Sequence, residues 1–212
     1  MGGDKSSLPH EGFFTYGADG TVRLWDTTTL SVTLPGATIP RLSMLLNVVN
    51  ETKHDLKDLS KPKNNGIKSF AIDVKSQLIA CGDRVGNITI FSMNSWSIIA
   101  IIGGQHSSEV TTLCFGRIKI PNADYLILAS AGGDGLVNLF DASKTQGSGS
   151  FKLVQKISDH ILGVSHVAFT VDGMQLVTSG QDKVIVFRSF MVLLRLICRK
   201  VRSHTSKVAE LH

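Results

Sequence analysis

Residues 132–141 read GGDGLVNLFD, a turn-forming cluster followed by a short run in which apolar residues dominate. Three other stretches follow the same plan, and each contains an aromatic side chain near its end. They read GADGTVRLWD at 17–26, CGDRVGNITIFS at 81–92 and GQDKVIVFRS at 180–189. Glycine and aspartate favour tight turns, and alternation with a period of two favours a strand. The chain therefore contains a repeated turn and strand.

The spacing of the aromatic residues supports a long repeat. Phe91 and Phe140 are 49 residues apart, and Phe140 and Phe187 are 47 residues apart. Both distances slightly exceed the roughly 40–45 residues of a four-stranded propeller blade. Loop insertions would produce this excess.

Further strand-like runs, rich in Val, Ile, Leu, Thr and Phe, flank the repeated turns. Two runs precede each of the last three turns: 67–72 with 77–81, 110–115 with 125–130, and 164–169 with 175–179. One run follows each of the first three aromatic positions: 42–49, 96–102 and 152–157. Four strands per repeat is the plan of a propeller blade. The sequence thus predicts an all-β fold, a partial β-propeller of about three to four four-stranded blades.

The positions of the repeats predict how the chain is organised. We expect a disordered N-terminus at 1–12, a propeller segment at 13–190 with a long inter-strand excursion at 27–64, and an off-pattern basic tail at 191–212. About three and a half blades can be counted, whereas propellers close with roughly 4–8. Open blade faces are adhesive. Two expectations follow: the chain is a truncated fragment of a larger scaffold, or a homodimer completes the ring.

Several dipeptides resemble those of the WD-repeat family. The Trp-Asp motif that ends such a repeat is present at 25–26 and survives as Phe-Asp at 140–141. The Gly-His motif that opens a repeat is reduced to its histidine at His106 and His160. This resemblance implies a WD-repeat propeller.

Longer runs resemble one branch of that family, the mitogen-activated protein kinase-binding protein 1 family. They include NGIKSFAIDVKSQLIACGDRVGNITIFSM at 65–93 and LILASAGGDGLVNLFDA at 126–142. The CGDRVG turn, with Val85 where most repeats have the turn aspartate, is part of the likeness. Members of this family are much longer, with two propellers and an extended tail. They scaffold stress-kinase signalling, and some act at spindle poles.

The branch resemblance implies a protein-interaction scaffold in the cytoplasm, at the centrosome or at the spindle pole. Its expected partners are other proteins, including protein kinases or centrosomal proteins. The kinase-docking portion of the family lies in the tail, outside the resemblance. Kinase scaffolding is therefore not carried over residue by residue.

The WD-repeat resemblance also implies a structural hydrogen-bond network in each repeat. In such repeats the opening histidine bonds the turn aspartate, and a strand hydroxyl and an aromatic residue complete the chain. This arrangement satisfies buried polar groups and holds the turn. The residues expected in these networks are Trp25, Asp19, His106, Ser130, Asp134, Phe140, His160, Ser179, Asp182 and Phe187.

One repeat contains His106, Ser130 and Asp134, the residue types of a catalytic triad. The next repeat contains nearly the same set. A catalytic centre has no reason to recur in each repeat, whereas a structural network does. The glycine run at 132–135 precedes a strand and not a helix, so it is not a phosphate loop. We expect a non-enzymatic protein with no catalytic residue.

The turn at 81–86 departs from the others. Val85 replaces the turn aspartate, and no histidine opens this repeat. We expect packing alone to hold this turn.

The formal net charge of the 212 residues is +5, and residues 190–212 contribute most of it. A nucleic-acid surface is therefore not expected. The stretch FMVLLRLICRKVR at 190–202 allows three interpretations: a fourth strand before a basic tail, an amphipathic membrane-binding element, or an end that leaves the family pattern. Peripheral membrane association through this tail is the alternative function.

Metal and redox chemistry find little support in the sequence. Cys81, Cys114 and Cys198 lie far apart, and the histidines show no spacing typical of metal ligands. We expect free thiols, no metal and no cofactor.

Overall fold

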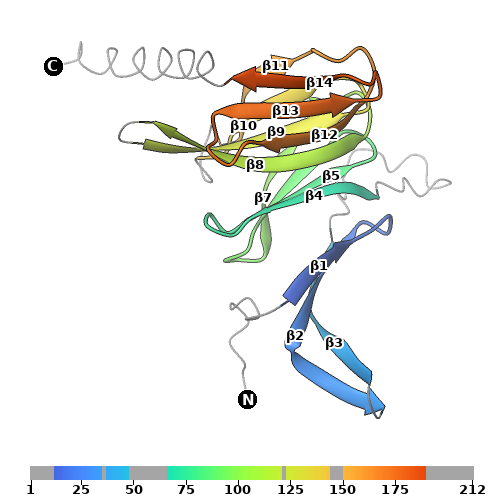
Figure 1. Cartoon of the computed structure of the whole chain (residues 1–212). Coiled ribbons are helices and arrows are strands. Elements are labelled where there is room, and N and C mark those ends of the chain that lie inside the picture. The colour runs from blue at the N-terminus through green and yellow to red at the C-terminus, as the bar shows by residue number, and fades with distance from the viewer. Residues whose placement is uncertain (1–11, 35–36, 48–65, 121–122, 144–149, 190–212) are drawn as a thin grey trace, which may run out of the picture. The chain divides into compact units, whose positions relative to one another are not determined.

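A computed structural model describes residues 12–34, 37–47, 66–120, 123–143 and 150–189, and the regular elements within these ranges are all β-strands (Figure 1). The chain divides into two compact units, residues 1–110 and 111–212. The predicted disordered N-terminus and basic tail fall on 1–11 and 190–212, outside the described residues, apart from Gly12, which begins the first strand.

Unit 1 contains two antiparallel sheets. Sheet 1 has the order β1 (Gly12–Tyr16), β2 (Thr21–Leu34) and β3 (Ala37–Asn47). Sheet 2 has the order β4 (Ile67–Asp73), β5 (Leu78–Asp83), β6 (Ile88–Ser92) and β7 (Ser97–Ile102). The predicted excursion at 27–64 therefore begins as a continuation of β2 and returns as β3, and residues 48–65 lie outside the described ranges.

Unit 2 also contains two antiparallel sheets. Sheet 3 has the order β11 (Lys152–Ile157), β10 (Val137–Asp141), β9 (Ala123–Gly132) and β8 (Val110–Ile120), with β8 starting at the unit boundary. Sheet 4 has the order β12 (Val164–Phe169), β13 (Gln175–Gly180) and β14 (Ile185–Ser189). The predicted all-β fold of consecutive antiparallel repeats is confirmed. Sheets 2 and 3 have the predicted four strands, and sheets 1 and 4 have three each within the described residues.

The register shows which residues of different sheets are equivalent. Ser130 pairs with Asn138 in sheet 3, and Thr178 pairs with Val186 in sheet 4. Both hydroxyl residues lie four positions before the turn aspartate of their hairpin. Cys81 in sheet 2 has the same place in its hairpin. Because the repeats share one register, a role found in one sheet can be sought at the same position in another.

The two faces of each sheet have different roles in packing. We call the face that carries Leu176 and its equivalents the leading face, and the face that carries Val177 and its equivalents the trailing face. In unit 2 the trailing face of sheet 3 packs on the leading face of sheet 4, whose buried residues include Val164, Val167 and Leu176. In unit 1 the trailing face of sheet 1 packs likewise on the leading face of sheet 2. Burial of apolar side chains between such faces is the main stabilising contribution in each unit.

A hydroxyl ties two sheets of unit 2 together. The Thr111 hydroxyl lies 2.6 Å from the carbonyl oxygen of Val164 and 3.0 Å from that of Ala131, both acceptors. These bonds connect β8 and β9 of sheet 3 with the first residue of β12. They satisfy backbone groups at a place where two sheets meet.

Candidate functional site

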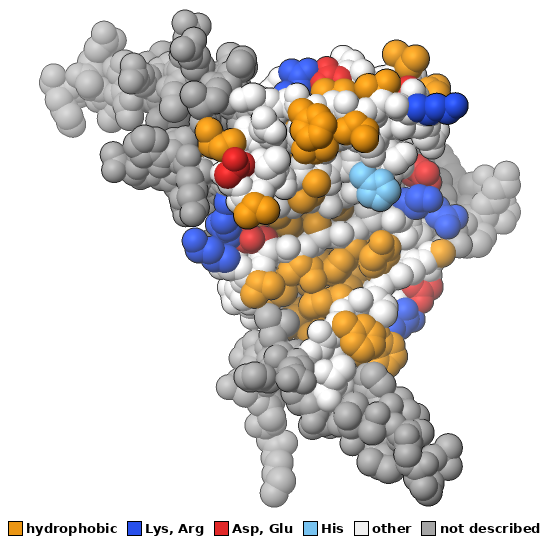
Figure 2. All heavy atoms as spheres, in the orientation of Figure 1, with side chains coloured by type: hydrophobic (Ala, Val, Ile, Leu, Met, Phe, Trp, Pro, Cys, Tyr) orange, Lys and Arg blue, Asp and Glu red, His pale blue; other side chains and the backbone are white. Residues whose placement is uncertain are grey.

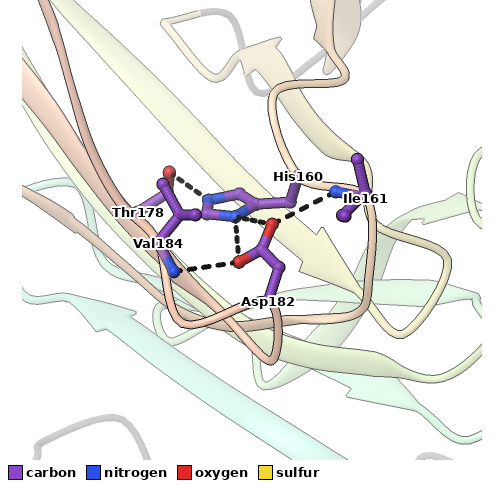
Figure 3. Close-up of polar contacts among 5 residues, drawn as sticks. All are labelled: His160, Ile161, Thr178, Asp182 and Val184. Atoms are coloured by element: carbon purple, nitrogen blue, oxygen red, sulfur yellow. Dashed lines mark hydrogen bonds and ion pairs between the residues drawn. The ribbon is translucent and has the colours of Figure 1, made fainter.

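The hydrogen-bond network at the β13–β14 turn joins three side chains from separate segments (Figure 3). His160 lies in the loop that enters sheet 4, Thr178 in β13 and Asp182 in the turn. His160 Nδ1 is 3.0 Å from Asp182 Oδ2 and 3.1 Å from Oδ1, and His160 Nε2 is 2.8 Å from Thr178 Oγ1. The structure thus brings His160 and Asp182, both predicted for a network of this repeat, within hydrogen-bond distance.

The chemistry of the three groups sets the direction of these bonds. An ionised carboxylate only accepts hydrogen bonds, so His160 Nδ1 carries the proton that it donates to Asp182. In the neutral imidazole Nε2 then accepts from the Thr178 hydroxyl. Burial raises the pKa of Asp182, but hydrogen bonds from His160, Val184 and Ile161 lower it more, so the pKa lies below its usual range.

The arrangement has the connectivity of a catalytic triad, carboxylate to imidazole to hydroxyl, but not its accessibility. The side chains of His160 and Asp182 expose only 1% and 4% of their surface, and Thr178 is buried. A nucleophile must reach a substrate carbonyl, and a buried Oγ1 does not. The network therefore acts on the structure of the turn.

Two predicted members of this network are displaced by one residue. We expected Ser179 to supply the hydroxyl, but Thr178 supplies it. We also expected Phe187 in the aromatic place, but Phe187 is 67% exposed and pairs with Val177 on the trailing face. Adjacent residues of a strand point to opposite faces, so an error of one residue exchanges the two faces. Counting from the turn aspartate would have avoided both errors.

Arg188 occupies the position in sheet 4 that Phe140 has in sheet 3. Each lies six residues after its turn aspartate and opposite an equivalent residue of the preceding strand. Arg188 donates from Nη2 and Nε to Asp159, at 2.5 and 2.6 Å for Nη2 to the two carboxylate oxygens and 3.0 Å for Nε. Such a bidentate ion pair fixes the orientation of both side chains. An ion pair thus stands where an aromatic residue was predicted.

Sheet 1 contains the part of the network that sheet 4 lacks. Trp25 Nε1 donates to Thr15 Oγ1 at 2.8 Å, and the rings of Trp25 and Phe13 stack with centroids 6.3 Å apart. The turn residue Asp19 accepts from Thr21 and Arg23. These bonds, led by that from Arg23, lower the pKa of Asp19 to about 2. The sequence predicted Trp25 and Asp19 but missed Thr15.

The predicted residues of sheet 3 are placed as expected from the repeat. His106, Ser130 and Phe140 are buried. Asp134 Oδ1 accepts from the amide of Leu136 at 3.2 Å, the bond that an aspartate makes to the second residue after it in a tight turn. Their positions match those of His160, Thr178, Arg188 and Asp182 in sheet 4.

The expectation that packing alone holds the turn of sheet 2 is wrong. Asp83 Oδ1 accepts from the amides of Val85 at 2.9 Å and Asn87 at 2.8 Å, and Asp83 Oδ2 accepts from Asn87 Nδ2 at 2.9 Å. The turn carboxylate of sheet 2 therefore lies two residues earlier in the repeat than that of sheet 4, at the position equivalent to Gly180. A carboxylate in either position can satisfy the amides of a tight turn.

Large apolar side chains surround the outer end of the sheet 4 network. We define the rim patch as Ile161, Leu162 and Val184, which are all exposed, Ile161 to 88%. Asp182 accepts from the amide of Ile161 at 3.2 Å and from that of Val184 at 3.1 Å, and Figure 3 shows both residues beside the carboxylate. The buried network therefore fixes the backbone from which the rim patch projects.

Other kinds of site receive no support within the described residues. Cys81 and Cys114 are free, and burial raises the pKa of both thiols, which disfavours the reactive thiolate. Over the described ranges there is no cluster of metal-ligating side chains and no helix long and apolar enough to cross a membrane. Cys198 lies outside the described residues.

Comparison with known proteins identifies the repeat. The family described as "WD domain, G-beta repeat" matches residues 151–187, which hold β11, β12, β13 and the first three residues of β14. A solved structure of Sqt1 from Saccharomyces cerevisiae superposes with a TM-score of 0.53 at 17% identity, over 82% of this chain and 39% of that one. The fold is a partial WD-repeat propeller.

Sequence relatives extend this likeness to most of the chain. Mitogen-activated protein kinase-binding protein 1 of Mus musculus is 29% identical over 87% of this chain, and that of Homo sapiens 28% over 88%. DNA damage-binding protein 2 of Bos taurus is 30% identical over 55% of the chain. This chain spans 13% of the length of the two kinase-binding proteins.

Proposed function

We propose that this WD-repeat chain, which is similar to mitogen-activated protein kinase-binding protein 1 over most of its length, is a non-enzymatic protein-interaction scaffold. The observation that carries the proposal is the rim patch. It presents three large apolar side chains to solvent on backbone that a buried network holds. Apolar side chains on rigid backbone bind at a low cost in conformational entropy.

A mitogen-activated protein kinase is the first candidate partner, in a contact separate from the tail by which the family docks kinases. The support is the name of the relatives, which cover most of this chain. A centrosomal protein and a second copy of the chain are the further candidates. We propose the cytoplasm, near the kinase or the microtubule-organising machinery, as the setting, and the position of a fluorescently tagged chain in cells tests it.

The rim patch supplies the variant for a binding experiment. Ile161→Asp places a charge at the most exposed side chain of the patch, and we expect it to weaken binding of purified kinase by about tenfold or more. Val171→Asp is the matched control, because Val171 is an exposed apolar residue in the β12–β13 turn at the other end of the same sheet. Calorimetric titration measures both affinities.

The outcomes separate the parts of the proposal. Equal binding by wild type and Ile161→Asp would show that the rim patch does not bind the kinase. No binding by wild type would remove the kinase as partner. Equal loss in both variants would point to general damage, which thermal unfolding of each variant detects.

A further inference from the structure

The trailing face of sheet 4 is open, although the same face of sheet 3 is covered. In sheet 3 the positions of Val137 and Leu139 are buried against sheet 4. Their equivalents in sheet 4 are Ile185 and Phe187, which are 63% and 67% exposed. The side chains are equally apolar, so the difference lies in what covers them. Figure 2 shows hydrophobic side chains at the surface over β12–β14.

The register defines the whole open face. Besides Ile185 and Phe187 it carries Gln175, Val177 and Ser179 of β13 and Ser189 of β14. Ala168 and the exposed His166 of β12 pair with Val177 and Ser179. No Asp, Glu, Lys or Arg stands among these residues. A flat apolar sheet face of this kind gains free energy when another apolar face covers it.

The packing within each unit shows what kind of surface covers a trailing face. In unit 2 the cover is the leading face of sheet 4, and in unit 1 it is the leading face of sheet 2. The leading face of another sheet of this type therefore has the right chemistry to cover the open trailing face. Packing of a trailing face on a leading face thus occurs twice within one chain, once in each unit.

Among the sheets that the structure describes, sheet 1 has an uncovered leading face. Phe13, Leu42 and Leu45 are exposed there, and Trp25 lies between them, opposite Phe13 on one side and Leu42 on the other. The only charged side chain at these register positions is Arg23, which is paired with Asp19 at 2.7 Å. This face is apolar and free of unpaired charge, as the trailing face of sheet 4 is.

We infer that the chain binds a second copy of itself head to tail, with the trailing face of sheet 4 on the leading face of sheet 1 of the next copy. Two different faces meet, so the contact is heterologous, and it builds a ring or an open chain of copies. This deepens the proposed scaffold function, on which it rests for the view that the chain binds proteins. The partner is a second copy of the chain, and the two faces that meet are the trailing face of sheet 4 and the leading face of sheet 1.

A heterologous contact permits a complementation test on the full chain. Phe187→Glu places a charge on the trailing face of sheet 4, and Leu42→Glu places one on the leading face of sheet 1. Light scattering after size exclusion is expected to show wild type growing in mass with concentration. Each variant alone is expected to associate more weakly by about tenfold or more, because a charge would be buried in an apolar contact.

A mixture of the two variants is the decisive sample. Phe187→Glu still offers an intact sheet 1 face, and Leu42→Glu still offers an intact sheet 4 face, so the mixture forms one good contact. We expect a one-to-one dimer that does not grow further. Val171→Glu is the matched control and is expected to associate as wild type does.

Other outcomes overturn the inference. A wild type that stays monomeric at high concentration shows that neither face accepts a second copy. Variants that associate as strongly as wild type place the contact elsewhere, and a mixture that stays monomeric shows a symmetric contact. Thermal unfolding confirms that each variant is folded. Ile161→Asp separates this result from the scaffold proposal, because it is expected to lower kinase binding and leave self-association unchanged.

Discussion

The turns of sheet 2 and sheet 4 share a closing backbone hydrogen bond but have different polar anchors. Each is closed by a bond from its first amide to its fifth carbonyl, Asp83 to Asn87 at 3.0 Å and Gly180 to Val184 at 3.2 Å. In sheet 2 the partners of the carboxylate among the described residues all lie within its own turn. In sheet 4 Asp182 also bonds His160 and the amide of Ile161, more than 20 residues away in sequence.

The anchor of sheet 2 is local, because it joins residues of one turn, whereas the anchor of sheet 4 is tertiary, because it joins segments distant in sequence. The Asp83 carboxylate stabilises a turn that adjacent residues already form. Asp182 joins the turn to the loop that enters the sheet, and through His160 to Thr178 of β13. Loss of the tertiary anchor should therefore loosen the whole sheet, whereas loss of the local one should loosen a single turn.

The largest expected effect comes from His160→Leu. This change removes the donor to Asp182 and the partner of Thr178 and leaves both polar groups buried, at a cost of about 2–3 kcal/mol. We expect faster amide hydrogen exchange across β12–β14 and a lower unfolding temperature.

Asp83→Ala is the matched comparison for His160→Leu. It removes three hydrogen bonds within one turn, and we expect a smaller cost of about 1 kcal/mol, with faster exchange confined to residues 82–88. Equal spreading of exchange in the two variants would contradict the distinction between local and tertiary anchors.

An intermediate effect is expected from acid. The pKa of Asp182 is lower in the folded chain than its usual unfolded value of about 3.9, so folding favours the ionised form. The resulting stability is present above pH 4 and is lost as pH falls through the folded pKa. Asp182→Asn should lower the unfolding temperature at neutral pH and flatten its decline below about pH 4. A decline as steep as that of wild type would assign the acid sensitivity to other carboxyl groups.

The smallest effect is expected from Lys183→Gly, and it is a gain. The equivalent turn positions hold Gly86 and Gly135, with φ of 99° and 79°, whereas Lys183 has φ of 65°. A side chain in this left-handed region costs roughly 1 kcal/mol. Glycine avoids this cost because it has no Cβ, but the larger entropy of its unfolded state offsets part of the gain. We expect a gain of about 0.5 kcal/mol in thermal or denaturant unfolding. Gly135→Lys is the reciprocal change and should destabilise sheet 3.

Much of the fold was predictable because the repeat is visible in local residue patterns. Strands predicted at 164–169 and 175–179 correspond to β12 and β13, and that at 152–157 to β11. The residue types of the network were predictable too, since His160 and Asp182 recur at repeat spacing. The Asp83 anchor also had a local signal. An aspartate that precedes its two amide partners, Val85 and Asn87, by two and four residues is typical of a tight turn.

The errors came from register. Ser179 and Phe187 are each one residue from the position that the network uses. Composition is almost unchanged by such a shift, so the pattern alone does not reveal it. The pairing of Arg188 with Asp159 was missed for another reason, since the two residues are 29 positions apart and their residue types are not those of the repeat motif.

The sequence by itself determined the class of fold, the number of repeats and the turns, because glycine, aspartate and period-two alternation act over a few residues. The tertiary structure decided which hydroxyl meets His160, which side chain replaces the aromatic residue, and which apolar faces are covered. These depend on strand register and on sheet packing, which bring together residues far apart in the chain. Phe187 illustrates the division: its apolar character is read from the sequence, but its exposure follows from the face on which the register places it.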